Sequence, residues 1–387
     1  MLASVCSVPS APRRFVPSAQ ADGRPIGPLA PTSVEGHLRS VRAGGRPALA
    51  ARPEGRGALG PPAPTSVEGP YWSLLLEVSQ LKILVTGGAG FIGSHVVDAF
   101  LGAGHEVHVL DSLVHGKPER LDPRAVLHVM DVRDRSLTAL LATERFDAVS
   151  HHAAQIDIRR SVDDPMYDAD VNILGSLNLL TASVAAGVRK LIYASSGGAV
   201  YGEPRYLPAD ERHPIEPVSP YGVSKYAVEL YLRQFAATHG LRYTILRYPN
   251  VYGPRQDPLG EAGVVAIFAR RMLAAEDIEI YGTGEQERDF LFVGDCARAN
   301  LMSLDSADGC TLNLGTGSGT TINQLFRAIA SITGYSIRPG YAPARKGETF
   351  RMAVDASRAR EVLAWQPSIS LEEGLRLTVS SFRQAMG

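Results

Sequence analysis

The chain has 387 residues, enough for two domains, and its formal net charge of −1 excludes the strong field that binding to nucleic acid or an anionic membrane would need. No apolar run approaches the ~20 residues of a membrane span. The three cysteines, Cys6, Cys296 and Cys310, fit neither a disulfide framework nor a metal site. We therefore expect a cytoplasmic protein without nucleic-acid or membrane partners.

Residues 1–79 differ in composition from the rest of the chain. They contain 12 of the 26 prolines and no lysine, and no apolar period runs through them. We predict a disordered Pro/Gly/Arg-rich tail, because such a segment cannot bury enough apolar surface to offset its ordering entropy. The stretch APTSVEG occurs twice in it, but two copies without an apolar face do not form a solenoid. A targeting peptide is one explanation; a start codon assigned too far upstream is the one we favour.

Strand and helix patterns alternate from residue 81 onward. Apolar runs predict strands at 81–86, 106–111, 126–131, 148–154 and 191–195, and helices at 136–143 and 171–186. This alternation predicts a Rossmann-type, doubly wound parallel sheet in an α/β domain over residues 80–251. A return segment near 287–310 and a smaller α/β substrate-binding lobe over 252–387 complete the expected organisation, with the substrate between the lobes.

A glycine-rich turn, TGGAGFIG, follows the first strand and opens a helix. Gly87 permits the tight turn, Gly90 lets the backbone approach a pyrophosphate, and Gly93 lets helix and strand pack closely. Phe91 and Ile92 lie in the first turn of the following helix, whose free N–H groups would bind the phosphates. The turn therefore predicts a dinucleotide site.

Carboxylates end the second and third predicted strands. Asp111 would accept hydrogen bonds from the ribose and repel a 2′-phosphate, which favours NAD over NADP, although it could instead cap the following turn. Asp131 would meet the adenine, unless it is only a loop aspartate. Val132, just after the third strand, and Ala153, near the end of the fourth, complete the expected cofactor contacts.

One predicted helix carries both Tyr221 and Lys225, in the stretch SPYGVSKYAV. Residues four apart share a helix face, so the two side chains can meet the same ligand. Tyrosine is a poor base at neutral pH, but a nearby ammonium favours the phenolate. The pair is therefore a candidate proton-transfer site.

The motifs TGGAGFIG, SSGGAVYG and YGVSK together resemble the extended short-chain dehydrogenase/reductase family. Within it, HHAAQIDIRRSVDDP, RYPNVYGPRQDP and GTGEQERDFLFVGDCARA resemble the UDP-glucose 4-epimerase group, from about residue 81 to 382. The resemblance implies a catalytic Tyr–Lys–Ser/Thr trio, in which Tyr221 is the base and Lys225 its electrostatic partner, both in contact with the cofactor. Aligned on VYG without gaps, the group's serine falls on Gly197, so we assign the hydroxyl to Ser196, which would also touch the substrate; Ser195 or a water molecule is the alternative.

The resemblance also indicates which of two reactions, epimerisation or elimination of water, the site would catalyse. Related 4,6-dehydratases place Asp-Glu after the hydroxyl residue, where this sequence has Gly198 and Ala199. Without that acid we expect NAD-dependent 4-epimerisation of a UDP-hexose, most simply UDP-glucose and UDP-galactose. A 4-epimerase for UDP-glucuronate or UDP-N-acetylhexosamine is the alternative, and a non-catalytic NAD-binding protein is an alternative of another class.

The resemblance assigns the UDP-sugar to three further side chains, Asn250, Arg288 and Arg345, although Arg345 could be a surface charge. Arg159 and Arg160 are left out as solvated charges. Adjacent histidines at the end of the fourth strand point to opposite faces, so no metal site is expected. Family analogy suggests a homodimer joined by the helices at 171–186 and 221–237, and Trp365 is expected in the core.

Overall fold

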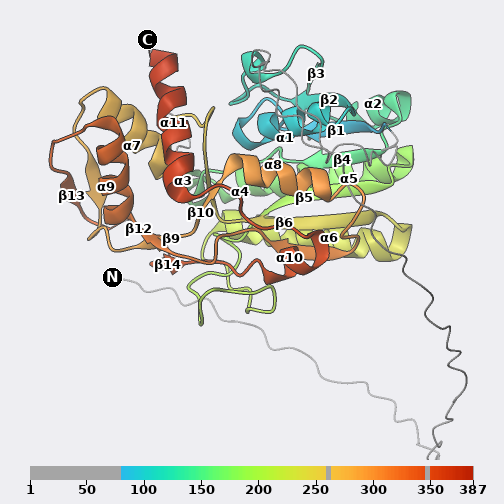
Figure 1. Cartoon of the computed structure of the whole chain (residues 1–387). Coiled ribbons are helices and arrows are strands. Elements are labelled where there is room, and N and C mark those ends of the chain that lie inside the picture. The colour runs from blue at the N-terminus through green and yellow to red at the C-terminus, as the bar shows by residue number, and fades with distance from the viewer. Residues whose placement is uncertain (1–79, 259–262, 345–348, 387) are drawn as a thin grey trace, which may run out of the picture. The chain divides into compact units, whose positions relative to one another are not determined.

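The computed structural model describes residues 80–258, 263–344 and 349–386, and the statements below concern these ranges (Figure 1). The predicted disordered tail lies outside them. The described residues fall within one compact unit. The boundary near residue 251 therefore stays a prediction.

A seven-stranded parallel sheet lies at the centre, in the order β11-β6-β5-β4-β1-β2-β3. The prediction of a Rossmann-type doubly wound sheet is confirmed. The third and fourth strands end earlier than predicted, because the chain enters loops that line the cavity described below. The strands are β1 (Lys82–Thr86), β2 (Glu106–Asp111), β3 (Val126–Val129), β4 (Ala148–His151), β5 (Lys190–Ser196), β6 (Arg242–Tyr248) and β11 (Cys310–Asn313).

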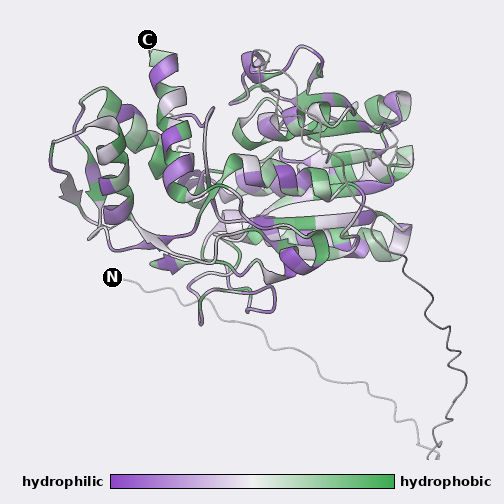
Figure 2. Ribbon diagram, viewed as in Figure 1, coloured by the Kyte–Doolittle hydropathy of each residue, from purple (hydrophilic) through white to green (hydrophobic). Residues whose placement is uncertain are grey.

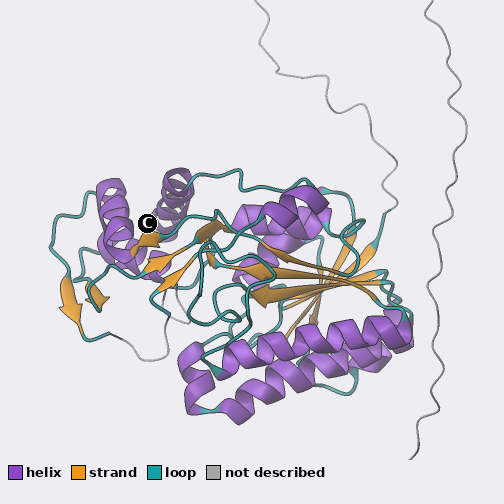
Figure 3. Cartoon of the chain, turned by 90° about the horizontal axis from the view of Figure 1, so that it is seen from below, coloured by secondary structure: helices purple, strands orange, loops and turns teal. Residues whose placement is uncertain are grey.

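Helices cover both faces of this sheet (Figure 3). One apolar core joins one sheet face to α1 (Phe91–Gly102), α8 (Val293–Met302) and α10 (Ser357–Leu363), and Trp365 is fully buried in it, as predicted. The other face packs against α2 (Leu137–Glu144), α5 (Gly175–Ala186) and α6 (Pro220–His239). The predicted return of the chain to the sheet is seen in α8 and β11, which lie on and in the main sheet.

The helix before β5 is longer than predicted. A short helix α3 (Ile158–Asp163) leads into α4 (Pro165–Ala169), which continues through the π-helical turn η2 (Asp170–Leu174) into α5. The continuous helix Pro165–Ala186 is long and apolar enough to cross a membrane by length and composition alone, so the expectation that no run approaches a span is wrong there. Core helices pass the same test, and this one packs against α2 and α6.

The C-terminal part of the chain forms a second layer of helices with short strands. Its apolar core joins α7 (Val264–Leu273), α9 (Ile322–Thr333) and α11 (Leu371–Met386). These helices carry hydrophilic and hydrophobic residues together, as amphipathic helices do (Figure 2). The short strands are β7 (Asn250–Tyr252), β8 (Glu279–Tyr281), β9 (Glu287–Arg288), β10 (Phe290–Phe292), β12 (Thr320–Thr321), β13 (Gly340–Ala342) and β14 (Arg351–Met352).

Candidate active site

A cavity of about 420 Å³ lies at the carboxyl ends of the central strands, where a doubly wound sheet binds its ligands. Chain order reverses between β1 and β4, so the loops after these strands separate and leave a crevice. Every predicted cofactor residue lines the cavity, as do Ser196 and Asn250. The cofactor residues are Gly87, Gly90, Phe91, Ile92, Gly93, Asp111, Asp131, Val132, Ala153, Tyr221 and Lys225.

The glycine turn leaves no room for side chains at two of its positions. Gly87 has φ +68°, and a Cβ atom there would lie 2.7 Å from the Ala153 nitrogen. A Cβ at Gly93 would lie 2.2 Å from the Gly87 oxygen, so this glycine allows α1 to approach β1. No side chain caps the first turn of α1 after Gly90. The turn therefore presents bare backbone and a helix N-terminus to the cavity, which fits a pyrophosphate.

Asp111 ends β2 as a buried carboxylate. Its two oxygens accept hydrogen bonds from the N–H groups of Leu113, at 2.9 Å, and Ala89, at 3.0 Å. Burial raises the pKa of the Asp111 carboxyl, while these two N–H groups lower it. A fixed carboxylate at this strand end fits the ribose hydroxyls of a dinucleotide.

Asp131, which is predicted to meet the adenine, is bound by a neighbouring arginine. The Arg133 guanidinium binds both of its oxygens, at 2.9 and 2.7 Å, and also reaches Asp170 at 2.6 Å. Arg133 lowers the pKa of the Asp131 carboxyl. Contact with an adenine therefore stays a prediction, and it would use the remaining lone pairs of a carboxylate already bound to arginine.

Helix α6 positions Tyr221 and Lys225 on one face. Ser219 caps the helix by accepting a hydrogen bond from the Gly222 N–H, and Pro220 occupies the first turn. The Lys225 amino group lies 5.8 Å from the centroid of the Tyr221 ring and donates to the Ala194 carbonyl at 2.9 Å. Burial lowers the pKa of the Lys225 ammonium to about 8.

The two serines at the end of β5 have different partners. The Ser195 hydroxyl donates to Glu229 at 2.6 Å, in a buried cluster in which Arg247 binds both oxygens of Glu229. Both serines line the cavity, but Ser196 is the next residue along the strand, so its side chain points to the other face, away from Glu229. The geometry therefore favours Ser196 over Ser195 as the hydroxyl of the site.

Gly197 lies against β6, where a side chain would fit only tightly. A Cβ atom there would lie 3.2 Å from Val354 Cγ1 and 3.3 Å from the Arg247 oxygen. A side chain at position 197 would thus meet the neighbouring strand, and Gly197 is absent from the described residues that line the cavity. Gly197, which stands where the resembled group has its serine, therefore does not create an empty space in the cavity.

Position 198 is where the site lacks a carboxyl group. A Cβ at Gly198 would have Asn250 Oδ1 and Ser196 Oγ as its nearest neighbours, both at 3.9 Å, which is ordinary contact. A side chain here would therefore extend between a predicted substrate residue and the predicted catalytic hydroxyl. The space between Asn250 and Ser196 could therefore hold a side chain, but Gly198 places no carboxyl group there.

The adjacent histidines point to opposite faces, as predicted. His151 bonds to Thr86 at 2.7 Å, whereas His152 bonds to Ser150 at 2.9 Å and stacks on Tyr248. Burial lowers the pKa of His152 to about 3, so it is neutral. His152 lines the cavity, next to the predicted cofactor residue Ala153.

The three predicted substrate residues differ in where they lie relative to the cavity. Asn250 lines the cavity beside position 198. Arg288 is not among the described lining residues; it donates to the carbonyls of Glu287 and Phe350, so its role stays a prediction. Arg345 lies outside the described residues. Arg160, which the sequence analysis left out, does line the cavity, with its guanidinium 4.0 Å from the centroid of the Tyr167 ring.

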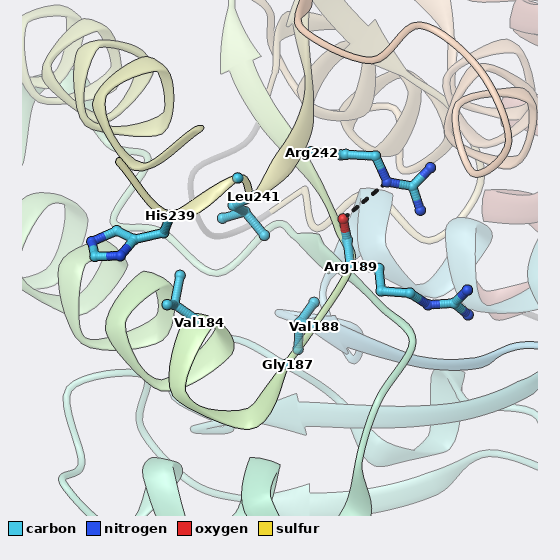
Figure 4. Close-up of a pocket in the computed structure, with 8 residues that line it drawn as sticks. Val184, Gly187, Val188, Arg189, His239, Leu241 and Arg242 are labelled. Atoms are coloured by element: carbon cyan, nitrogen blue, oxygen red, sulfur yellow. Dashed lines mark hydrogen bonds between the residues drawn. The ribbon is translucent and has the colours of Figure 1, made fainter. Parts of the chain in front are cut away.

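A second pocket, of about 330 Å³, lies where the chain enters β5 and β6, at the opposite ends of these strands from the cavity (Figure 4). Its two arginines already have partners: Arg189 pairs with Asp147, and Arg242 pairs with Asp308 and donates to the Arg189 carbonyl. Its described lining contains no carboxylate, hydroxyl or thiol side chain. We assign it no chemistry.

A Rossmann sheet with a Tyr–Lys pair and a strand-end hydroxyl in its cavity defines a short-chain dehydrogenase type of site. Residues 83–315 match the NAD dependent epimerase/dehydratase family. The UDP-glucose 4-epimerase of Mycolicibacterium smegmatis is 44% identical over 309 residues, which cover 78% of this chain and 99% of that protein. The chain belongs to the NAD dependent epimerase/dehydratase family.

Solved structures agree with this assignment. The Thermotoga maritima UDP-glucose 4-epimerase, solved with UDP-glucose, is 49% identical, with a TM-score of 0.78, and the match covers 79% of this chain and 100% of that one. The Thermus thermophilus UDP-glucose 4-epimerase, solved as a complex with NAD, is 44% identical, with a TM-score of 0.76 and the same coverage.

Proposed function

We propose that this protein interconverts UDP-glucose and UDP-galactose by inverting the sugar at C4, with NAD as its cofactor. The observation that carries this proposal is the end of β5, where Ser196 faces the cavity and position 198 holds no carboxyl group. Elimination of water needs a general acid and base on the sugar, whereas oxidation and re-reduction at one carbon need only one proton-transfer site.

The residues present fit NAD. The backbone of the glycine turn and the N-terminus of α1 would hold the pyrophosphate, and Asp111 the adenosine ribose. When bound, NAD supplies the acceptor and donor of the C4 hydride.

The protein's own groups handle the proton. Tyr221 accepts the proton of the sugar 4-hydroxyl and returns it after inversion, and Ser196 orients that hydroxyl. The buried Lys225 ammonium favours the phenolate form of Tyr221, and its bond to the Ala194 carbonyl fixes it in place. Inversion requires the oxidised sugar to turn over, so we expect the cavity to hold the nucleotide more firmly than the hexose.

The test uses the full chain. Purified protein receives UDP-galactose without added NAD, and chromatography follows UDP-glucose; Tyr221→Phe is the matched control. We expect conversion by the wild type, and at least a ~100-fold slower rate in the variant with its NAD content unchanged. No conversion with NAD supplied would contradict the hexose assignment, and assays with UDP-glucuronate and UDP-N-acetylglucosamine would then decide between the alternatives. Failure with all of them would favour a non-catalytic NAD-binding protein.

We also propose a homodimer joined through the face formed by α3 to α6. Helices α3, α4 and η2 lie beside α6, and this region exposes large apolar side chains. Several large apolar side chains exposed on one group of neighbouring helices suit an association site. Analytical ultracentrifugation should show a dimer that Leu230→Glu weakens. The exposed apolar residues are Val162, Met166, Leu174, Val223, Leu230 and Tyr231.

For localisation we propose the cytoplasm. The support is chemical, because Cys296 and Cys310 are free thiols, as a reducing compartment favours. Fractionation of cells that express the full chain would test it.

A further inference from the structure

Two histidines and a carboxylate meet outside the active site. His108 lies on β2, His128 on β3, and Glu144 is the last residue of α2. One ligand atom from each lies within 4.8 Å of the other two. The His108 Nδ1 and His128 Nε2 atoms are 2.8 Å apart, and the two rings stack. The sequence predicts no metal site, because the three residues lie on separate elements and share no short spacing.

Glu106 fixes the chemistry of His108. Its Oε1 atom lies 3.1 Å from His108 Nε2, so this nitrogen carries the proton and donates it. The lone pair of His108 therefore sits on Nδ1, the atom that faces His128 and Glu144. A ligating histidine almost always donates its other N–H to such a partner, which fixes the tautomer and makes the ligating nitrogen more basic.

The ligand types select the ion. Two imidazole nitrogens and one carboxylate oxygen suit Zn²⁺, whereas Mg²⁺ and Ca²⁺ prefer oxygen ligands alone. We propose that His108, His128 and Glu144 form a Zn²⁺-binding site, with water as a fourth ligand. The Glu144 side chain is 25% exposed, which leaves solvent access, while the His108 ring is buried against Phe146.

Binding needs small movements. Zn–N bonds of about 2.0–2.1 Å in a tetrahedron place two nitrogens about 3.3 Å apart, so the imidazoles must separate by about 0.5 Å. His128 Nε2, which donates to His108 in the metal-free cluster, must shift its proton to Nδ1. Metal binding requires deprotonated ligands, so the affinity of the site should fall at acidic pH.

Lys82 is the competitor for this site. Its amino group lies 2.6 Å from Glu144 and 3.2 Å from Glu106. A metal ion must take Glu144 from the lysine, which can keep its contact with Glu106. The two kinds of substitution should therefore change the Zn²⁺ affinity in opposite directions. Removing the lysine charge should tighten Zn²⁺ binding, whereas removing a ligand should weaken it.

The site would tie β2 to β3 near the cavity. His108 and His128 each lie three residues before a predicted cofactor carboxylate, Asp111 and Asp131. Zn²⁺ binding to the folded state should therefore raise the thermal unfolding midpoint.

The experiment titrates Zn²⁺ into untagged, EDTA-treated full chain by calorimetry and repeats it with His128→Gln. His239→Gln, at an exposed histidine outside the cluster, is the control, and circular dichroism checks folding. We expect one site per chain that His239→Gln retains, that His128→Gln weakens at least tenfold, and that Lys82→Met tightens. Glu106→Gln should weaken binding about 10–100-fold.

Three results would overturn the site. Equal Zn²⁺ binding by the wild type and His128→Gln would place the ion elsewhere, and so would a sulfur-to-metal absorption band when Co²⁺ replaces Zn²⁺. Absence of saturable binding in both the wild type and Lys82→Met would show that the cluster is only a hydrogen-bonded charge network.

Discussion

The Ser195 hydroxyl donates to the Glu229 carboxylate at 2.6 Å across the buried contact between β5 and α6. Both serines line the cavity, and this bond occupies the Ser195 hydroxyl, which favours Ser196 as the hydroxyl of the site. We predict that Ser196→Ala lowers kcat about 100-fold or more, the range expected for a lost proton-transfer partner.

Ser195→Ala is the matched control for that prediction. It removes one hydrogen bond to a charged group, so we expect a loss of about 1–2 kcal/mol in the free energy of unfolding and a kcat within a few-fold of the wild type. Steady-state kinetics and urea unfolding of both variants provide the measurement. A larger kcat loss in Ser195→Ala than in Ser196→Ala would reverse the assignment.

Neighbouring glycines after β5 should respond in opposite ways to substitution. Gly197→Ser puts its Cβ 3.2 Å from Val354 Cγ1 and 3.3 Å from the Arg247 oxygen, so we expect lower stability, about 1–3 kcal/mol, because these neighbours must give way. Gly198→Asp has room, so we expect little change in unfolding but a kcat at least about tenfold lower, because its carboxylate would compete for the Ser196 proton. Thermal unfolding and turnover of both variants separate the two effects, and a Gly197→Ser protein with wild-type stability would contradict the packing argument.

Much of this site follows from local sequence signals. The glycine turn, the strand-end Asp111 and the Tyr221–Lys225 pair lie within short segments whose spacing reflects one turn or one helix face. The choice between Ser195 and Ser196 could not be predicted in this way, because it depends on Glu229, which lies 34 residues further on.

Other features depend on contacts between distant elements. Asp131 binds Arg133, and that arginine is held in turn by Asp170, 37 residues away along the chain. The zinc ligands come from two strands and a helix, and no spacing between them signals a site. The length of the helix before β5 was missed because its π-turn shifts the apolar period there.

The Lys225 ammonium should limit activity at alkaline pH. Its pKa of about 8 means that the charge is lost as pH rises through this value, so kcat should fall above about pH 8. Lys225→Met should have a low kcat throughout and lack this alkaline limb. A wild-type profile that stays flat to pH 10 would show that the lysine charge is not needed.

Stability should change in the opposite direction with pH. Between about 8 and the ordinary lysine value of 10.5, the unfolded chain binds a proton at Lys225 that the folded chain does not. Below pH 8 the folded state bears the whole cost of burying the Lys225 charge. This cost falls as pH rises from about 8 to 10.5. The free energy of unfolding of the wild type, relative to Lys225→Met, should therefore rise over this range.

The buried pair of Glu229 and Arg247 should show strong coupling. Arg247 binds both Glu229 oxygens, at 2.9 and 2.6 Å, and both side chains are at most 2% exposed. Glu229→Gln leaves a buried guanidinium without its counter-charge, so we expect a loss of about 3–5 kcal/mol in the free energy of unfolding.

Replacing both partners tests whether the pair or the charge is responsible. The double variant Glu229→Leu with Arg247→Met removes both charges and keeps apolar volume, so it should unfold within about 2 kcal/mol of the wild type. Because Glu229 lies one helical turn beyond Lys225 on α6, the double variant should still lose kcat if the pair positions this helix against β5. Urea unfolding and kinetics of the single and double variants measure both effects. A double variant as unstable as Glu229→Gln would show that the lost hydrogen bonds, and not the unpaired charge, dominate.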